Sequence, residues 1–299
     1  MALTLTEAAK LSNNIVLQGI VETIVKESPI LQILPFIDIN GNALVYNQEN
    51  TLPAANFYNV GDTWNESTPT FTQQTATLAI LGGDADVDQY IQQTRTNIQD
   101  IEAVVIELKA KAVRIAWENS FLNGPLGGAG VTPGFNGIDY LCAAPQIVTA
   151  GTGNGGPLTL SLLDQLIDLV RPGKPDLLLL SRRTRRTLTQ LVRASGAFIE
   201  SEVNNFGLWQ QYYNGIPVGV SDYINDGATV GTSSNCSTIY AMQFGEGRIA
   251  GLQGAGGLQV ERVGPVQTKD AIRWRIKWYS SVACFGTLCL AKLNGLTPS

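Results

Sequence analysis

The sequence predicts an α+β protein in which an extended hairpin and one long helix precede a region of alternating helices and strands. First, the stretch from Asp88 to Leu122 contains no Pro or Gly. Second, the interval between Lys26 and Arg95 is acidic and contains no Lys or Arg. Third, strand-like and helix-like runs alternate after residue 147, as in a mixed domain. We therefore expect an elongated building block rather than a compact enzyme.

The composition is that of a folded chain with little charged surface. Hydrophobic residues make up 44% of the 299 residues, charged residues only 15%, and the mean hydropathy is +0.06. No run of about 18 apolar residues is present that could span a bilayer, so we expect no membrane partner. Interface cores are depleted in Lys, Glu and Asp, and the low charge therefore favours extensive contacts between copies of the chain.

Several function classes are excluded by residue counts. The chain contains no His, which excludes Ser-His-Asp and Cys-His catalysis and every His-ligated metal site. Its four cysteines are scattered without a CxxC pair, and their apolar or small neighbours predict buried free thiols. The net charge of −5 argues against a surface that grips nucleic acid throughout. The N-terminus carries no signal-peptide pattern, so we expect synthesis in the cytoplasm. We also expect no cofactor.

The first elements are an amphipathic helix and a hairpin. Residues 6–26 predict the helix, with Thr6 as its cap and Ser28-Pro29 as its end. Residues 42–50 and 70–81 predict two strands of about 30 Å each, at roughly 3.3 Å per residue. A two-stranded hairpin is marginal by itself, so we expect a neighbouring copy of the chain to support it.

The Pro- and Gly-free stretch predicts a single helix of roughly 50 Å, at about 1.5 Å per residue. Its apolar stripe comprises Ile91, Thr94, Ile98, Ile101, Val105, Leu108, Ala112 and Ile115. Asp84, Asp86 and Asp88 precede it, which favours helix capping over a calcium loop, because the Gly and Glu of such a loop are missing. Weak heptads and the absence of complementary flanking charges favour packing on a sheet of the same chain over a coiled coil.

The second half of the chain follows a Gly-rich loop, from Gly124-Pro125 to Gly137. Residues 160–170 and 182–194 predict helices, and residues 177–180 predict the strand between them. From Ile272 to Leu293 the chain is rich in strand residues, with Trp274, Ile276 and Trp278 alternating with Arg273, Arg275 and Lys277.

One motif is typical of a nucleotide-binding enzyme. Gly151, Gly153 and Gly156 match GxGxxG after a predicted strand. In a dinucleotide site the helix begins within that loop, but here Pro157 and Thr159 intervene, and Asp176 precedes its strand instead of following it. These departures favour a surface loop, and the nucleotide-binding enzyme stays as an alternative.

Five arginines on one predicted helix form a basic run: Arg182, Arg183, Arg185, Arg186 and Arg193. They could contact nucleic acid phosphates, or they could pair with carboxylates of the same or an adjacent subunit. No interleaved aromatic residues accompany them, so base stacking is not expected. The sequence favours ion pairing.

The order of these parts resembles that of the major capsid proteins of tailed bacteriophages that share the HK97 fold. The motifs that carry the resemblance are DVDQYIQQTRTNIQDIEAVVIELKAKAVRIAWENSFLNG from Asp86, DLLLLSRRTRRTLTQLV from Asp176 and NGIPVGVSDYI from Asn214. The resemblance implies five parts: an N-terminal arm (1–40), an E-loop hairpin (41–84), a P-domain with the spine helix (85–143), an A-domain (144–254), and C-terminal strands returning to both domains (255–299).

The resemblance implies self-assembly into hexamers and pentamers of an icosahedral shell around double-stranded DNA, in a virion assembled in the host cytoplasm. It implies a portal and a separate scaffolding or decoration protein as partners, and no catalytic role. Residues 41–80 contain no Lys, so the isopeptide crosslink that some relatives form from this loop is excluded. The candidate intersubunit contacts are Asn56, Tyr58, Asp62, Trp64, Arg182, Arg183 and Arg186. An encapsulin-type protein compartment is the alternative with a similar fold.

Overall fold

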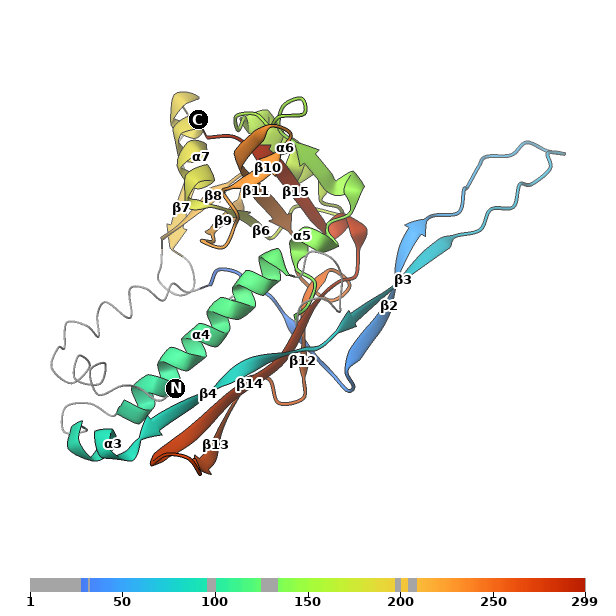
Figure 1. Ribbon diagram of the computed structural model, residues 1–299. Coiled ribbons are helices and arrows are strands. Elements are labelled where there is room, and N and C mark those ends of the chain that lie inside the picture. Colours follow the sequence, from blue (N-terminus) through green and yellow to red (C-terminus); the bar gives the residue numbers. More distant parts are fainter. Residues whose placement is uncertain are drawn as a thin grey trace.

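The computed structural model describes residues 28–31, 33–95, 101–124, 134–196, 200–203 and 209–298. The helix predicted over residues 6–26 lies outside these residues. The molecule has a two-part body from which a thin ribbon projects (Figure 1). Strands and helices both contribute extensively to the body, which confirms the α+β class.

The first sheet forms the lower part of the body. Among the described residues it has five strands, in the order β1-β12-β14-β13 with β4 paired to β14. Their bounds are β1 Phe36–Ile39, β4 Ala79–Asp88, β12 Ile249–Gly254, β13 Gln259–Pro265 and β14 Ala271–Cys284. β1 runs parallel to β12, and the other pairs are antiparallel. The long strand β14 therefore joins chain segments almost 200 residues apart.

Helix α4, Ile101–Asn123, packs on one face of this sheet, as the sequence predicted. Trp117 is fully buried and stacks on Trp278 of β14, with ring centroids 5.4 Å apart. Its indole N–H donates to the Ser280 hydroxyl at 2.7 Å, which satisfies the one polar atom of the side chain. The helix is thus fixed to the sheet by an aromatic cluster.

The buried stripe of α4 matches the predicted one at its start, where Ile101 is buried and Val105 packs beside it, and differs further along the helix. The side chains that pack into the core are Ile106, Ala110, Val113, Trp117 and Phe121. Of the predicted stripe, Ala112 is exposed, and Leu108 and Ile115 are only half-buried. Apolar residues occur on several sides of α4, so spacing alone did not identify the face that meets the sheet.

The single helix from Asp88 to Leu122 is also wrong. The chain continues β4 to Asp88, forms the short helix α3, Gln89–Arg95, and begins α4 at Ile101. The Gln92 amide donates to the Glu102 carboxylate at 2.9 Å. Residues ten apart in one straight helix are separated by about 15 Å along the axis, so α3 and α4 cannot be continuous. Figure 1 shows α3 at the lower end of the sheet, with α4 returning over it.

The acidic segment before α3 has two roles rather than one. Asp88 accepts the backbone N–H groups of Tyr90 and Ile91 at 2.9 and 3.4 Å, which confirms its capping role. Asp84 and Asp86 instead lie in β4, and capping was wrong for them. Alternation along β4 points these two carboxylates to the face of the sheet opposite α4.

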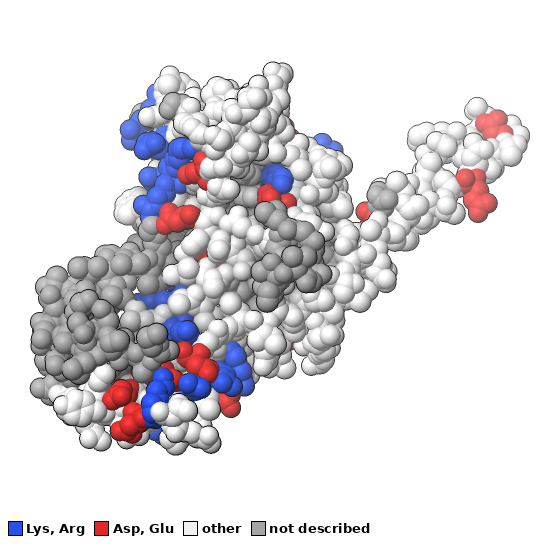
Figure 2. Space-filling view, viewed as in Figure 1, with Lys and Arg blue, Asp and Glu red and all other residues white. Residues whose placement is uncertain are grey.

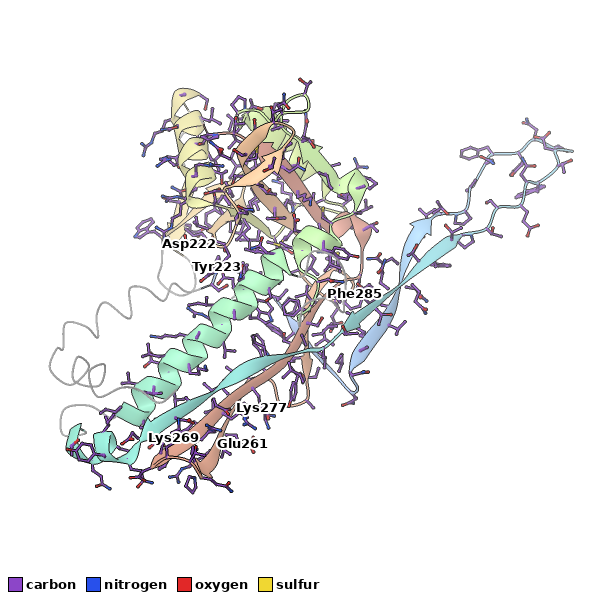
Figure 3. All side chains as sticks on the ribbon, in the orientation of Figure 1. Asp222, Tyr223, Glu261, Lys269, Lys277 and Phe285 are labelled. Carbon is purple, nitrogen blue, oxygen red and sulfur yellow. The ribbon has the colours of Figure 1, made fainter. Side chains whose placement is uncertain are left out.

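On that face the carboxylates form a ladder of ion pairs with β14. Arg273 donates to Asp86 at 2.7 and 2.8 Å, and Arg275 donates to Asp84 at 2.7 and 3.0 Å. Figure 2 shows acidic and basic groups side by side at this end of the molecule. Figure 3 labels three further members, Glu261, Lys269 and Lys277. The predicted alternation of β14 is therefore confirmed: its arginines pair on one face while Ile276 and Trp278 are buried on the other.

The second sheet forms the upper part of the body. Among the described residues it has eight strands, in the order β5-β15-β11-β6-β9-β8-β7 with β10 paired to β11. The bounds are β5 Ile147–Thr149, β6 Leu177–Leu180, β7 Glu200–Val203, β8 Trp209–Tyr213, β9 Ile216–Val220, β10 Ala228–Val230, β11 Ser233–Met242 and β15 Leu290–Leu296. Short helical segments, α5 Ile138–Leu141, η1 Ala144–Gln146 and η2 Thr287–Cys289, connect the parts.

Strand β6 lies in the middle of this sheet and is buried on both faces. Leu177 and Leu179 join the core shared with α4, whereas Leu178 and Leu180 join a second core beneath two helices. These helices are α6, Leu160–Leu169, and α7, Arg182–Ala194. A run of four leucines is typical of a strand covered on both sides, and the sequence predicted all three elements.

The division into five parts stays a prediction, and two of its boundaries cut across the pairing of strands in the first sheet. Residue 84 lies inside β4, and β12, which the segment 144–254 included, pairs in the first sheet. Both differences arise from pairing between distant strands, which local patterns do not show.

Candidate intersubunit surfaces

The projecting ribbon is the hairpin that the sequence predicted. It consists of β2, Ala43–Thr51, and β3, Thr70–Thr77, in antiparallel register from Ala43–Thr77 to Thr51–Thr70. Its tip, residues 52–69, extends far from the body (Figure 1). Within the part of the chain that the structure describes, nothing lies beneath the outer half of the hairpin.

The tip exposes large apolar side chains. Leu52, Phe57, Val60 and Trp64 are each at least 76% exposed. Such apolar surface without a core behind it is typical of a protein contact site. The tip is nevertheless ordered locally, because Trp64 stacks on Tyr58 with ring centroids 4.5 Å apart.

Hydrogen bonds add to the order of the tip. The Asp62 carboxylate accepts the backbone N–H of Asn59 at 2.6 Å, and the Tyr58 hydroxyl accepts that of Asn65 at 3.2 Å. Asn56 is exposed as well and precedes Tyr58 by two residues. Of the predicted contact residues in the tip, Tyr58, Asp62 and Trp64 thus help to shape it.

The root of the hairpin is fixed to the body at the end of β14. The ring of Tyr46 lies 4.8 Å from that of Phe285, and the Gln48 amide donates to the carbonyl oxygen of Cys284 at 2.5 Å. Burial raises the pKa of Tyr46 to about 12, so the phenol stays neutral. These two contacts set the direction in which the ribbon leaves the body.

The ribbon carries only negative charge. Residues 43–77 contain Glu49, Asp62 and Glu66 and no Lys or Arg. In Figure 2 the projecting part shows acidic but no basic groups. A surface that receives it must be apolar with neutral or positive surroundings, because like charges repel.

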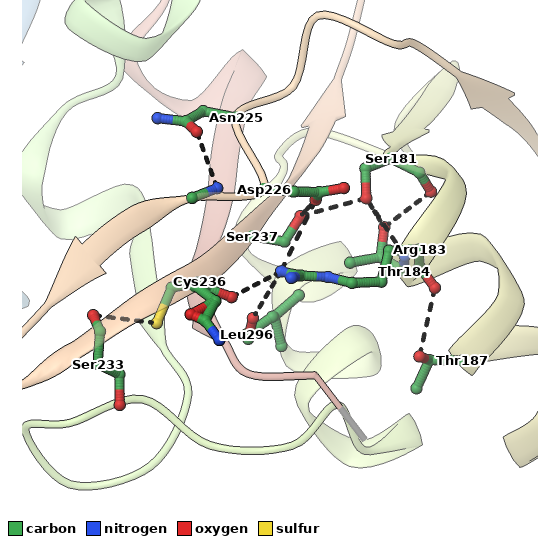
Figure 4. Close-up of polar contacts among 12 residues, drawn as sticks. Ser181, Arg183, Thr184, Thr187, Asn225, Asp226, Ser233, Cys236, Ser237 and Leu296 are labelled. Atoms are coloured by element: carbon green, nitrogen blue, oxygen red, sulfur yellow. Dashed lines mark hydrogen bonds and ion pairs between the residues drawn. The ribbon is translucent and has the colours of Figure 1, made fainter.

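The arginine helix α7 is the second candidate surface. Its N-cap is Ser181, whose hydroxyl accepts the backbone N–H of Thr184. The buried Ser237 hydroxyl donates to Asp226 at 2.5 Å and lies 3.3 Å from the Ser181 hydroxyl, so the cap is tied to β11 (Figure 4). This network fixes the start of α7 and hence the position of its arginines.

Two of the arginines are paired within the chain. Arg182 forms an ion pair with Asp222 at 2.5 Å. Arg183 donates to the carbonyl oxygen of Asn235 at 2.8 Å and lies 3.8 Å from Asp226 (Figure 4). Intrasubunit pairing was one of the interpretations that the sequence left open. Arg182 and Arg183 form such pairs.

The other arginines of α7 face solvent. Arg185, Arg186 and Arg193 are exposed, and Figure 2 shows basic groups gathered over this part of the body. They lie on the opposite side of the molecule from the hairpin tip (Figure 1). One chain therefore does not bring the two sets of predicted contact residues together, and their contacts with other subunits stay predictions.

Sequence analysis did not identify the residues that fix the start of α7 and the root of the hairpin in place. Asp222 and Asp226 lie about forty residues after Arg182 and Arg183, and Tyr46 and Gln48 meet the end of β14 more than 230 residues later. No local pattern connects such pairs. The one signal was the aromatic Tyr46, which follows the apolar start of β2 and precedes its polar half.

The GxGxxG loop is built into the sheet. The Gly156 N–H donates to the carbonyl oxygen of Gly295, and the Gly156 carbonyl accepts from Thr297. Helix α6 begins only at Leu160, where Thr159 accepts the N–H of Leu162. This arrangement leaves no helix N-terminus within the loop for a pyrophosphate, which favours the surface-loop interpretation.

The described residues contain neither a cluster of metal-ligand side chains nor a membrane-spanning helix. Within those residues, no group of three or more potential ligands is placed to hold a metal ion. None of the helices described is both long and apolar enough to cross a membrane.

Comparison with known protein families identifies the class of this chain. Residues 11–276 match the profile of the phage capsid family, and the chain belongs to this family. Its architecture is the HK97 fold of phage capsid proteins. Family and fold together define a structural capsid shell protein.

Similar solved structures share this fold at low sequence identity. The SrpI encapsulin of Synechococcus elongatus, in its holo complex, is 18% identical with a TM-score of 0.72, over 100% of this chain and 98% of that chain. The structure from Mycobacterium phage Bobi is 15% identical with a TM-score of 0.64, over 98% of both chains. The capsid of a native GTA particle is 14% identical with a TM-score of 0.64, over 90% of both chains. No curated protein sequence matches the chain.

Proposed function

We propose that this chain is the major capsid protein of a tailed bacteriophage, which assembles into hexamers and pentamers of an icosahedral shell around double-stranded DNA. The observation that carries the proposal is the exposed apolar tip of the hairpin in a member of the phage capsid family. Burying it on a neighbouring copy would remove its large apolar side chains from water. Assembly takes place in the host cytoplasm, with a portal and a separate scaffolding or decoration protein.

The mechanism is mechanical. The hairpin lies over a neighbouring subunit, α4 braced on the first sheet stiffens the wall, and the second sheet with α7 packs around the capsomer axis. Many copies of one interface stabilise the shell, each burying more than the roughly 1,600 Å² of a standard interface.

Replacing residues 52–69 by Asn-Gly tests the role of the tip. Because the tip contacts none of the described residues of the body, the shortened subunit should keep the melting temperature of the full chain while shell formation is lost. Negative-stain microscopy and sedimentation velocity measure assembly. Closed shells of normal size from this variant would refute the proposal.

A single substitution gives a sharper comparison. Trp64 and Trp209 are 78% and 77% exposed, but only Trp64 lies in the tip. Trp64→Ser should raise the concentration needed for assembly, and Trp209→Ser is the control matched for exposure and chemistry. Equal effects of both substitutions would contradict a special role of the tip.

We further propose that the exposed arginines of α7 contact either packaged DNA or carboxylates of an adjacent subunit. The double variant Arg185→Glu/Arg186→Glu separates the two targets. Intact empty shells with impaired DNA packaging would identify DNA, whereas failed capsomers would identify a subunit contact. Arg171→Glu is the control, since Arg171 is exposed but lies outside α7.

The second candidate is an encapsulin-type compartment that encloses cargo protein. It is favoured by the TM-score of 0.72 to the SrpI encapsulin, against 0.64 to the phage Bobi structure. Particles purified from the native source distinguish the two. Nuclease-protected DNA would support the phage capsid, and an enclosed protein without DNA would support the compartment.

A further inference from the structure

Two of the four cysteines lie side by side beneath the turn that supports the hairpin. The sulfur atoms of Cys284 and Cys289 are 3.4 Å apart. Cys284 ends β14, and Cys289 ends the short helix η2. The other two cysteines, Cys142 and Cys236, are equally buried, but their sulfur contacts are to carbonyl oxygens at 3.8 to 3.9 Å.

The sulfur atoms of Cys284 and Cys289 are close enough to form a disulfide bond after a small movement. Both thiols lie within hydrogen-bond distance of one acceptor, the carbonyl oxygen of Gly286, at 3.1 Å from Cys284 and 2.8 Å from Cys289. A disulfide needs a sulfur–sulfur distance of about 2.05 Å, so the two atoms have to approach by only about 1.4 Å in total.

The pair lies one layer below the surface. Phe285, Gly286 and Thr287 of the connecting turn are half-buried, and Leu288 is 45% exposed. A small oxidant therefore has a short path to the sulfur atoms once the turn opens locally.

We propose that Cys284 and Cys289 are a disulfide-forming pair that reacts with hydroperoxides and, when oxidised, locks the turn that anchors the hairpin.

The reaction proceeds in two balanced steps. The Cys289 thiolate attacks one oxygen of hydrogen peroxide, the O–O bond breaks, and the hydroxide released takes a proton to become water. The resulting sulfenic acid is attacked at sulfur by Cys284, the S–O bond breaks, and a second water leaves with the Cys284 proton. Two thiols and one peroxide thus give one disulfide and two waters.

The electrostatics of the pair agree with this order. The hydrogen bond between the two sulfurs lowers the pKa of Cys289, whereas the same bond together with burial raises the pKa of Cys284. Cys289 is therefore the attacking thiolate and Cys284 the resolving thiol.

The bond would act on the hairpin through two contacts already described. Phe285 packs against Tyr46, and the Cys284 carbonyl accepts from Gln48. Both groups belong to the turn that the bond closes. Oxidation should therefore slow the opening of the hairpin root.

The test uses the purified full-length protein, first reduced and then treated with hydrogen peroxide. After denaturation, two of the four thiols should no longer react with N-ethylmaleimide. The tryptic peptide of residues 278–292, which contains both cysteines, should be lighter by two hydrogen atoms, and a thiol reductant should restore it. Four reactive thiols, or a bond that includes Cys142 or Cys236, would overturn the proposal.

Variants and hydrogen exchange complete the test. In Cys284→Ser the peroxide should leave Cys289 as a sulfenic or sulfinic acid, whereas Cys236→Ser should keep the bond. Amide exchange over residues 43–51 should be slower in the oxidised than in the reduced protein. Unchanged exchange despite a formed bond would refute the coupling to the hairpin.

Discussion

At the scale of single residues, Asp86 is the carboxylate that pairs with two basic side chains on the charged face of the first sheet. Its side chain is 5% exposed and accepts from both Lys269, at 2.5 Å, and Arg273, at 2.7 Å. Two cationic donors on one nearly buried carboxylate form a stronger unit than an exposed surface pair. The strand β4 therefore depends on its charge as well as on its packing.

Asp86→Asn should lower the free energy of unfolding by about 1–3 kcal/mol at neutral pH, because charged hydrogen bonds are lost. Hydrogen bonding to Arg273 and then Lys269 holds the pKa of Asp86 below its ordinary value. The stabilisation is therefore present above about pH 4 and is lost as the pH falls through the folded-state pKa. Urea unfolding of the unassembled subunit at pH 7 and pH 3 measures this difference.

The control is Asp270→Asn, since Asp270 is exposed and lies in the adjacent turn. It should change stability by less than about 0.5 kcal/mol. A difference between Asp86→Asn and the native chain that persisted unchanged at the lowest pH would argue against the ion pairs as its cause.

The sequence predicted the residue pattern of β14 but not its partners. Alternation of Trp274, Ile276 and Trp278 with basic residues identified a strand with one buried face, because period two is a local property. That Asp84 and Asp86 would face Arg275 and Arg273 depends on a register between segments about 190 residues apart. A helix-capping role was the best local explanation of those carboxylates, and distant pairing overrode it.

At the scale of elements, the hairpin root decides where the ribbon points. A two-stranded ribbon is marginal in water, so its ladder depends on the contact of Tyr46 with Phe285. Tyr46→Ala should weaken the root by about 1–3 kcal/mol, the range for burying a large apolar side chain. Amide exchange over residues 43–51 and 70–77 of the unassembled subunit should then accelerate at least about fivefold.

Val45→Ala is the matched control for that experiment. Val45 is the neighbour of Tyr46 in β2 but is 53% exposed on the other face of the ribbon. Its loss should leave exchange nearly unchanged. Equal acceleration in both variants would mean that strand propensity, rather than the root contact, holds the ribbon.

Elements were predicted well where local pattern and tertiary environment agree. The Leu177–Leu180 strand, α6, α7 and both hairpin strands follow from composition, caps and turns. The long helix failed because absence of Pro and Gly permits a helix without requiring one. Burial of Val87, Ile91 and Ile101 in one small cluster favours a chain reversal over a straight rod.

At the scale of the whole molecule, the net charge opposes assembly, whereas burial of apolar side chains favours it. Every subunit carries a net charge of −5, and its projecting ribbon is entirely acidic. Four arginines form ion pairs within the chain and are less available to a neighbour: Arg182, Arg183, Arg273 and Arg275. Subunits that approach one another should therefore experience mutual repulsion, overcome by burial of the apolar tip.

Salt should consequently promote assembly. Raising the ionic strength from about 0.1 M to 1 M shortens the screening length from about 10 Å to 3 Å, which weakens repulsion between subunits and leaves apolar burial intact. The concentration of free subunit in equilibrium with shells should fall as salt rises, measured by sedimentation and light scattering. Glu66→Gln, which removes one negative charge from the tip, should reduce this salt dependence. Shells that dissociate as salt rises would instead show that ion pairs, with the exposed arginines of α7 as the available cations, dominate the contact between subunits.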